Sequence, residues 1–417
     1  MDQTKLQTLK GFRDFLPQEA RKRQYAIAKI VEVFEYYGFD PLETPTLEYQ
    51  GVLLGKYGAE ADKLVFKFED EGGRKVALRY DQTVPVARVL AQYGQELPMP
   101  FKRYQIQSAF RAEKPQKGRF REFLQCDIDI VGANPPLPDA EILAVLFNVY
   151  QNLGVKNFKI KINDRKDLFA LLAKAGVPKD KELRATQIID KLDKAGDEKV
   201  RAMLSQATNP DVASSVLKLL SNNPTPSPEL EAISGKAFKL GVPEDCLTFS
   251  PYLARGLDYY TGLIMEGVID GYEGGSVFGG GRFDQLIGQL SGGKVDLPAV
   301  GVSIGIDRTV AALDSLKLLP ESKTAAQVLV TIFDSELADA SLALATTLRD
   351  NGLKVELYPS LSTKLDKQLK FADKKGIPFV LIIGAKEAQT KTATLKNMAS
   401  GDQQTLPLDK LADVIKS

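Results

Sequence analysis

The sequence contains no histidine and no tryptophan, and only two of its 417 residues are cysteines. Histidine is the usual general base near neutral pH and the commonest metal ligand in proteins. Its absence excludes catalytic triads built on histidine and zinc sites of the usual Cys/His kind. Cys126 and Cys246 alone cannot provide a disulfide framework. Any chemistry must therefore use carboxylates, arginine, lysine, tyrosine or groups of the substrate.

Long apolar runs and a large net charge are also absent. No stretch approaches the roughly 18 apolar residues of a spanning helix, and the N-terminal MDQTKLQTLKGFRDF lacks the apolar core of a signal peptide. We therefore expect a cytoplasmic protein that does not bind membranes. The 55 basic and 54 acidic residues nearly cancel, so a nucleic-acid surface would have to be local.

The periodicity divides the chain into a sheet domain in two parts, a helical insertion and a second, smaller domain. A chain of 417 residues exceeds what a single core usually serves. Strand patterns mixed with helices cover residues 1–160 and return at 249–322, which predicts an α+β sheet domain. Residues 161–248 are helical and carry the Pro/Ser-rich linker NNPTPSPEL. Residues 325–417 alternate strands and helices, which predicts a small α/β domain with a largely parallel sheet.

Residues 101–132 predict two strands joined by the charged loop KPQKG. After the loop, every second residue is aromatic, amide or charged, on the face formed by Arg121, Phe123, Gln125, Asp127 and Asp129. Same-face neighbours in a strand lie about 6.6 Å apart, so this row spans a small polar ligand. A solvated strand face is the commoner reason for such alternation. Here the strand leads into more protein, which favours a pocket floor, although Asp127 receives no specific role.

The segments before this strand pair predict a helix, an edge strand and a hairpin. Residues 17–38 have helical spacing and end at a glycine. Pro41 and Pro45 restrict the next short strand to an edge or an interface, and EGGR between LVFKFED and KVALRY is typical of a hairpin. Asp81 and Thr83 come where the following helix begins. Helix capping explains both residues, but a strand-to-helix junction also commonly opens onto a cleft.

Two cationic features stand out in the second half of the chain. Arg308 follows the strand GVSIG at the start of a helix, where the guanidinium and the helix N-terminus together would hold an anion. Taken alone, Arg308 is more simply a surface cation. Four lysines repeat at helical spacing in the terminal domain: Lys364, Lys367, Lys370 and Lys374. Such a stripe is usually a solvated helix face, and an RNA contact is the alternative.

Several of these segments resemble the signature motifs of class II aminoacyl-tRNA synthetases. FRAE with the charged loop and GRFREF resembles the second motif, IGIDR the third, and the helix with the Pro45 strand the first. ALRYDQTVPVAR, QCDIDIVG and ARGLDYYTG are similar to segments specific to histidyl-tRNA synthetases, in the form seen in archaeal and eukaryotic members. The resemblance runs from Gly11 to the C-terminus and includes the helical insertion.

This resemblance implies a fold, a reaction and partners. The antiparallel catalytic sheet, flanked by helices, would be divided between residues 1–160, with the first two motifs, and 249–322, with the histidine segment and the third motif. Residues 325–417 would form the α/β anticodon-binding domain. The implied reaction joins L-histidine and ATP to histidyl-adenylate and then transfers histidine to the 3′ end of tRNA(His). Mg²⁺ would accompany ATP, without a metal site made of protein side chains, and the first-motif helix and strand would form a homodimer.

The resemblance also implies which residues bind ATP. Arg111 would hold the α-phosphate, Glu113 the adenine amino group, and Phe123 would stack on the purine. Arg119 and Arg308 would bind the γ-phosphate. Attack of a carboxylate on a phosphate needs positioning and charge stabilisation rather than a proton acceptor. Fixed guanidiniums suit this task, so the lack of histidine does not impair the mechanism.

The implied amino-acid site and tRNA contacts complete the set. Histidine would be bound by Asp81, Gln82, Thr83, Gln125, Asp129, Arg255, Tyr259 and Tyr260. Within this set, Arg255 would stabilise charge on the α-phosphate as a catalytic residue together with Arg111, and Asp129 and Tyr260 would recognise the imidazole. Contacts to tRNA would come from Lys114 and Lys117 in the charged loop and from the four-lysine stripe.

Two departures and two alternatives accompany this interpretation. Phe283 stands where the family usually has tyrosine, and Leu124 stands where bacterial members often have histidine. A catalytically silent paralogue that binds histidine as a regulatory subunit of ATP phosphoribosyltransferase is one alternative. Such paralogues typically lack the terminal domain and the catalytic arginine, both of which this chain keeps. A tRNA-sensing regulator is the other, but no segment resembles an attached effector.

Overall fold

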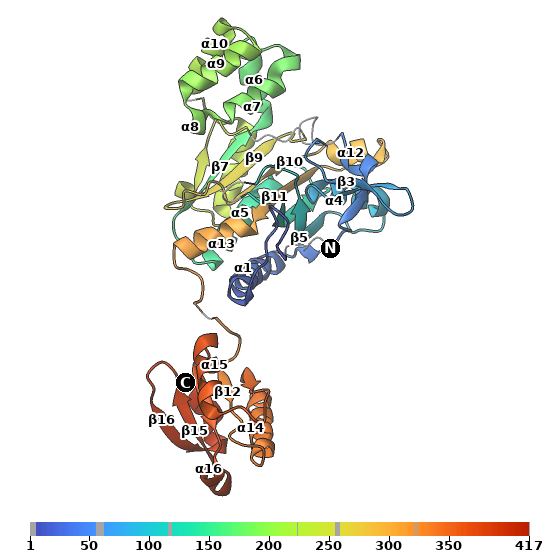
Figure 1. Cartoon of the computed structure of the whole chain (residues 1–417). Helices are drawn as coiled ribbons and strands as arrows, with labels where there is room; N and C mark the ends of the chain where they lie inside the picture. Colours follow the sequence, from blue (N-terminus) through green and yellow to red (C-terminus); the bar gives the residue numbers. More distant parts are fainter. Residues whose placement is uncertain are drawn as a thin grey trace. The chain divides into compact units, whose positions relative to one another are not determined.

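The computed structural model describes residues 6–55, 62–115, 119–222, 224–254, 259–321 and 323–416. The chain forms two compact units (Figure 1). The first contains Met1–Asp14 and Arg23–Leu319, and the second contains Phe15–Lys22 and Pro320–Ser417. Among the described helices, none is both long and apolar enough to cross a membrane.

An eight-stranded sheet organises the first unit. Its strand order is β1-β5-β6-β11-β10-β9-β7-β8, and neighbours from β5 through β7 pair antiparallel. The strands are β1 (Asp40–Pro41), β5 (Phe101–Phe110), β6 (Glu122–Val131), β7 (Phe158–Asp164), β8 (Leu247–Phe249), β9 (Leu263–Ile269), β10 (Phe278–Arg282) and β11 (Ala299–Gly305). The predicted strand pair in residues 101–132 is confirmed as β5 and β6, the second and third strands of this sheet.

Four helices cover one face of the sheet and share its largest core. They are α1 (Pro17–Tyr36), α5 (Leu137–Asn152), α11 (Pro228–Lys239) and α13 (Ile306–Ser315). Cys126, Ile128 and Ile130 of β6 point into this core. Because side chains alternate along a strand, the polar residues of β6 must face the other way. A smaller cluster packs α4 (Thr83–Tyr93) and α12 (Leu286–Ser291) beside β10 and β11.

The two prolines after α1 divide the predicted edge strand into two short pieces. β1 pairs with β5 at the edge of the large sheet, and β2 (Leu47–Tyr49) belongs to a separate three-stranded sheet of order β2-β4-β3. β3 (Lys67–Glu69) and β4 (Lys75–Leu78) form the predicted hairpin, and α2 (Gln50–Leu53) follows β2. Both strands beside the prolines lie at sheet edges, as expected for residues that cannot complete a ladder.

The helical insertion has a core of its own. It contains α6 (Arg165–Lys174), α7 (Glu182–Ile189), α8 (Leu192–Ala195), α9 (Asp197–Ala207) and α10 (Pro210–Ser221), and α11 returns the chain to the sheet. Asp164, Asn209 and Ser227 cap α6, α10 and α11 through side-chain oxygens. These caps place the helix starts where the sequence pattern indicates them.

The second unit carries a mixed five-stranded sheet of order β13-β12-β14-β15-β16. Its strands are β12 (Val328–Val330), β13 (Val355–Leu357), β14 (Phe379–Ile382), β15 (Thr392–Asn397) and β16 (Gln403–Pro407), and its helices are α14 (Ala338–Asp350), α15 (Leu365–Lys375), α16 (Ala385–Thr390) and α17 (Leu411–Lys416). β12 pairs parallel with β13 and β14, whereas β15 pairs antiparallel with β14 and β16. The largely parallel prediction is therefore wrong for half of the sheet, because the turn after β15 forms a hairpin.

Candidate active site

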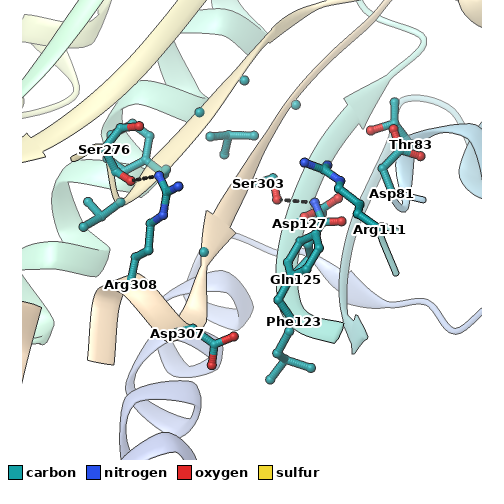
Figure 2. Close-up of a pocket in the computed structure, with 18 of the residues that line it drawn as sticks. Asp81, Thr83, Arg111, Phe123, Gln125, Asp127, Ser276, Ser303, Asp307 and Arg308 are labelled. Atoms are coloured by element: carbon teal, nitrogen blue, oxygen red, sulfur yellow. Dashed lines mark hydrogen bonds between the residues drawn. The ribbon is translucent and has the colours of Figure 1, made fainter. Parts of the chain in front are cut away.

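A cavity of about 500 Å³ opens on the sheet face opposite the large core. Its walls come from β6, β10 and β11, from the starts of α4 and α13, and from the tyrosine pair before β9. Figure 2 shows Arg308 on one side of the cavity and Arg111, Asp81 and Thr83 on the other. The predicted pocket floor on β6 is thus open to a ligand, although β6 lies between β5 and β11 inside the sheet.

The floor is the polar face of β6. Phe123, Gln125, Asp127 and Asp129 all line the cavity. Gln125 donates from Nε2 to Ser303 Oγ of β11 over 2.7 Å, which fixes its amide. Its Oε1 is buried and has no hydrogen-bond partner within the described part of the chain. That oxygen can therefore accept a hydrogen bond from a ligand.

A buried arginine lies beside this floor on the neighbouring strand. Arg103 of β5 is opposite Asp129 of β6, is fully buried and forms an ion pair with it. Burial raises the pKa of Asp129 to about 6, and the guanidinium partly opposes that increase. Arg103 also donates from Nη1 to Gln105 Oε1 over 3.3 Å, which orients the guanidinium. The ion pair therefore holds Asp129 in one place at the deep end of the cavity.

Asp127 occupies the adjacent position on the same face. It lies between Gln105 of β5 and Ser303 of β11, and only 3% of its surface is exposed. Burial raises its pKa to about 7, opposed by the charge of Arg103 and the contact with Ser303. Its Oδ1 is buried without a hydrogen-bond partner among the described residues. A buried carboxylate oxygen in that state costs free energy until a donor reaches it.

Glycines leave the room that this polar floor needs. A Cβ on Gly301 of β11 would lie 1.7 Å from Asp129 Oδ1, so the carboxylate occupies the space of a missing side chain. A Cβ on Gly281 of β10 would lie 2.8 Å from Tyr260 Cδ1. Glycine at these two positions therefore admits the side chains that face the cavity.

The outer end of the cavity carries an arginine between two aromatic rings. The Arg111 guanidinium carbon lies 4.4 Å from the centre of the Tyr80 ring and 5.0 Å from that of Phe123. Its Nε donates to the Tyr80 carbonyl over 3.3 Å. Glu113 and Arg119 also line the cavity, with 3.8 Å between their charged atoms. This end presents a flat aromatic surface with cations beside it.

The opposite wall carries Arg308 at the first turn of α13. Its Nη1 donates to the Ser276 carbonyl over 2.9 Å, as Figure 2 shows. Its neighbour Asp307 forms ion pairs with Arg13, at 3.1 Å, and with Arg23. Arg13 in turn lies over the Phe120 ring, 3.2 Å from its centre. The N-terminal segment therefore braces both the third-motif helix and the loop side of β6.

The inner wall combines the start of α4 with two tyrosines. Asp81 Oδ1 accepts a hydrogen bond from the Val84 amide over 3.2 Å, so Asp81 caps the helix and also lines the cavity. The Tyr259 and Tyr260 rings meet edge to face, with their centres 5.0 Å apart. Burial raises the pKa of Tyr259, which also contacts Thr83. This wall thus offers carboxylate and hydroxyl groups next to the acidic floor.

The cavity collects eleven of the side chains expected from the sequence: Asp81, Thr83, Arg111, Glu113, Arg119, Phe123, Gln125, Asp129, Tyr259, Tyr260 and Arg308. Gln82 does not line it. That side chain is buried and donates from Nε2 to the Gln107 and Gln125 carbonyls, over 2.8 and 3.2 Å. Gln82 therefore joins α4 to the floor strands. Arg255 and Lys117 lie outside the described residues.

Several lining residues were not expected from the sequence. Ser276, Ser303 and Asp307 contribute polar groups, and Arg103 supports the floor from the neighbouring strand, whereas Asp127 was expected on the floor without a specific role. The sequence does carry a signal for some of them. Small residues alternate at 301, 303 and 305 of β11, and polar residues alternate at 103, 105 and 107 of β5. Period-two patterns on neighbouring strands indicate one shared polar face.

The predicted tRNA contacts are exposed. Lys114 is exposed beside the second-motif loop. In the second unit, the stripe Lys364, Lys367, Lys370 and Lys374 is exposed along α15 and at the residue before it. Lys370 forms an exposed ion pair with Asp366 at 2.9 Å. The solvated-face interpretation of the stripe therefore fits the protein alone, and an RNA contact stays a prediction.

An antiparallel sheet with flanking helices, an arginine-bearing aromatic shelf and an acidic inner end define a catalytic domain of the class II aminoacyl-tRNA synthetases. The Histidyl-tRNA synthetase family model matches residues 11–309, and the Anticodon binding domain model matches residues 327–417. The chain therefore belongs to the histidyl-tRNA synthetase family.

Named relatives agree over nearly the whole length. The chain is 38% identical to the Histidine--tRNA ligase of Gloeobacter violaceus, with 98% of each chain covered. It is 40% identical to that of Aeropyrum pernix, with 98% of this chain and 97% of the relative covered. The crystal structure of histidyl-tRNA synthetase from a Nostoc species matches with a TM-score of 0.84 at 33% identity and 99% coverage of both chains.

Proposed function

We propose that this chain is a histidine–tRNA ligase, and that its cavity binds ATP and L-histidine side by side. The enzyme joins histidine to AMP with release of pyrophosphate and then transfers histidine to the 3′ end of tRNA(His). The observation that supports this most strongly is one continuous cavity with an arginine-flanked aromatic shelf at one end and buried carboxylates at the other. Such a cavity is complementary to a nucleotide and to an amino acid that carries hydrogen-bond donors.

The roles at the ATP end follow from the position of each side chain. Phe123 would offer its ring to the purine, and Glu113, which also lines the cavity, would accept from the adenine amino group. Arg111, held by the Tyr80 carbonyl, would bind the α-phosphate. Arg119 and Arg308 lie at the two sides where the terminal phosphates would extend. Planar guanidiniums with several donors bind phosphate oxygens in pairs.

The roles at the histidine end use the inner wall and the floor. Asp81 and Thr83 would bind the ammonium group, and Gln125 Oε1, which lacks a partner among the described residues, would accept from it as well. Asp129 and Tyr260 would contact the imidazole. Tyr259, whose ring packs edge to face on Tyr260, would line this end. Buried polar groups that no other side chain pairs with discriminate strongly against a ligand that cannot form hydrogen bonds with them.

The chemistry needs fixed charges more than proton transfer. A histidine carboxylate oxygen attacks the α-phosphorus, and pyrophosphate leaves on the opposite side. Arg111 and Arg255 would stabilise the charge that grows on the α-phosphate oxygens. In the transfer step a phosphate oxygen of the adenylate would accept the ribose hydroxyl proton, so the reaction needs no histidine base.

Mg²⁺ would enter with ATP rather than through a protein site. The described residues contain no cluster of three or more ligating side chains. The nearby carboxylates Glu113 and Asp307 already face Arg119, Arg13 and Arg23. Phosphate oxygens would therefore supply most ligands of the ion, which prefers oxygen and retains water. The ion would neutralise part of the phosphate charge.

The remaining assignments concern partners and organisation. We assign the catalytic domain to residues 1–160 and 249–322, with the insertion at 161–248, and recognition of the anticodon to 325–417. α1 and the β2 segment would form a homodimer interface, and Lys114, Lys117 and the α15 lysines would contact tRNA. The enzyme would act in the cytoplasm. A regulatory paralogue is disfavoured because ligases match this chain over nearly its whole length.

Histidine-dependent exchange of label between pyrophosphate and ATP tests the first step. We expect exchange with histidine and not with the other amino acids. Arg111→Ala and Arg255→Ala should each lower it by about 10²- to 10³-fold, whereas Arg184→Ala, at an exposed position of the insertion, should not. A folded wild-type protein without exchange would overturn the proposed function.

A further inference from the structure

The floor of the cavity carries one more carboxylate than the assigned roles use. Asp127 lines the cavity between Gln125 and Asp129, and the roles above include both neighbours but not Asp127. Its partner on β11 is Ser303, whereas Gly301 and Gly305 lie opposite Asp129 and Gln125. A buried acid is costly at that place unless it contacts something positive or a donor.

The buried arginine does not satisfy Asp127 through a hydrogen bond. Arg103 forms its ion pair with Asp129 and a hydrogen bond with Gln105. Ser303 contacts Asp127 but also accepts from Gln125. Asp127 Oδ1 remains without a hydrogen-bond partner in the parts of the chain that the structure describes. Oδ1 therefore has hydrogen-bond acceptor capacity that the described residues leave unused, on a side chain that lines the cavity.

We propose that Asp127 is a specificity-determining residue of the histidine site: with Asp129 it faces the imidazole ring, so that histidine binds with one extra proton shared between the ring and the carboxylate pair. This inference rests on the proposed histidine site. The imidazolium ring has two N–H donors and no acceptor. Two neighbouring carboxylates match that form, whereas a single carboxylate and a hydroxyl match the neutral ring.

The charges around Asp127 support this arrangement. The titratable or charged groups that face it are Asp129 on its own strand, Arg103 on β5, Arg79 and Asp81 before α4, and Tyr259 before β9. β11 contributes Ser303 and glycines, which do not ionise. Burial raises the pKa of Asp127 to about 7, close to the pKa of about 6.5 of a free imidazole. A proton can therefore pass between the two groups at little cost.

The proton count sets a clear pH dependence. Near pH 7 the empty site holds about half a proton on Asp127 and free histidine carries a smaller fraction, so binding takes up only part of a proton from solvent. Above that pH both Asp127 and free histidine have lost their protons, so binding takes up one proton from solvent. The KM for histidine should then rise toward tenfold per pH unit, about the change expected for one proton.

The test compares Asp127→Asn with the wild-type enzyme in histidine-dependent pyrophosphate exchange from pH 6 to 9. We expect Asp127→Asn to raise the KM for histidine about 10- to 100-fold at pH 7, the effect of losing a charge-assisted hydrogen bond. The KM for ATP should change by less than about twofold. The rise in KM above pH 7 should disappear in the variant. Asp245→Asn, at an 86% exposed side chain, controls for the change of one charge.

A measurement on the unaltered protein keeps the proposal testable if the variant does not fold. Calorimetric titration of the wild type with histidine at pH 8, in two buffers of different ionisation enthalpy, gives the number of protons taken up. We expect close to one, and close to zero would overturn the inference. An unchanged histidine KM with the same pH slope in folded Asp127→Asn would also overturn it. Loss of all wild-type exchange would instead contradict the proposed function itself.

Discussion

At the scale of single residues, the site depends on side chains that other residues hold in place. Arg103 fixes Asp129, Ser303 fixes the Gln125 amide, and the Tyr80 carbonyl fixes Arg111. A reaction that relies on positioning and fixed charge requires this rigidity more than it requires any one acid or base. A chain without histidine can therefore carry the chemistry.

The space beside Asp129 gives a first prediction. Gly301→Ala places a Cβ where the Asp129 carboxylate lies, 1.7 Å from Oδ1. We expect the carboxylate to be displaced and the KM for histidine in pyrophosphate exchange to rise by about tenfold or more. Gly305→Ala on the same strand is the matched control, because its nearest contact would be an ordinary 3.4 Å to the Val277 carbonyl. Equal effects of the two substitutions would contradict the role of this space.

The raised pKa of Asp127 gives a second prediction, for stability. The folded protein holds this proton more tightly than the unfolded chain, whose carboxyl pKa is near 3.8. The free energy of unfolding therefore falls as pH rises from about 4 to about 7, by an amount on the order of a few kcal/mol at most for this group. Asp127→Asn should raise the melting temperature by several degrees at pH 8 and by little at pH 4.5. A larger gain in melting temperature at pH 4.5 than at pH 8 would contradict this prediction.

At the scale of elements, period-two alternation was enough to find β6 and its pocket face. The sequence could not show that β11 presents a complementary face to it, because β11 and β6 are far apart in the chain. Arg103 was missed because the register of the predicted strand pair, which sets Arg103 opposite Asp129, cannot be derived from alternation alone. The prolines at 41 and 45 correctly predicted strands at sheet edges. The single strand expected there is, however, two separate strands, β1 and β2.

The stripe on α15 gives a third prediction. Lys367→Glu with Lys374→Glu replaces two exposed cations by anions on one helix face. If the stripe contacts tRNA, the KM for tRNA in charging should rise about 10-fold or more at low salt, and less at high salt. Pyrophosphate exchange should stay unchanged. The double change Lys410→Glu and Lys416→Glu, also exposed, is the control, and an equal effect would indicate only a general loss of charge.

At the scale of the whole molecule, the sequence predicted a sheet domain and a smaller α/β domain, and the chain forms two compact units that each contain a sheet. It misjudged the second sheet, whose antiparallel half forms through the β15–β16 hairpin. Residue spacing indicates strands well, but parallel and antiparallel neighbours have the same spacing. The family resemblance added what spacing could not, because motif order identifies which strands share a site.

The proposed homodimer gives a fourth prediction. Leu47 and Tyr49 of β2 are 44% and 59% exposed, in the segment assigned to the interface. Leu47→Glu with Tyr49→Glu should yield a monomer in light-scattering chromatography and lower charging activity. Leu240→Glu, at a similarly exposed residue after α11, should leave the mass unchanged. A double variant that keeps the mass of the wild type would exclude this interface.

Charging of tRNA with the intact chain decides whether the protein is a histidine–tRNA ligase. Purified protein, ATP, Mg²⁺ and labelled histidine are mixed with a tRNA(His) transcript, and acid-insoluble label on the tRNA is counted. We expect label at the 3′ end of tRNA(His), dependent on ATP, and none with a tRNA of a different anticodon or with another labelled amino acid. Pyrophosphate exchange without any transfer to tRNA(His) would contradict it.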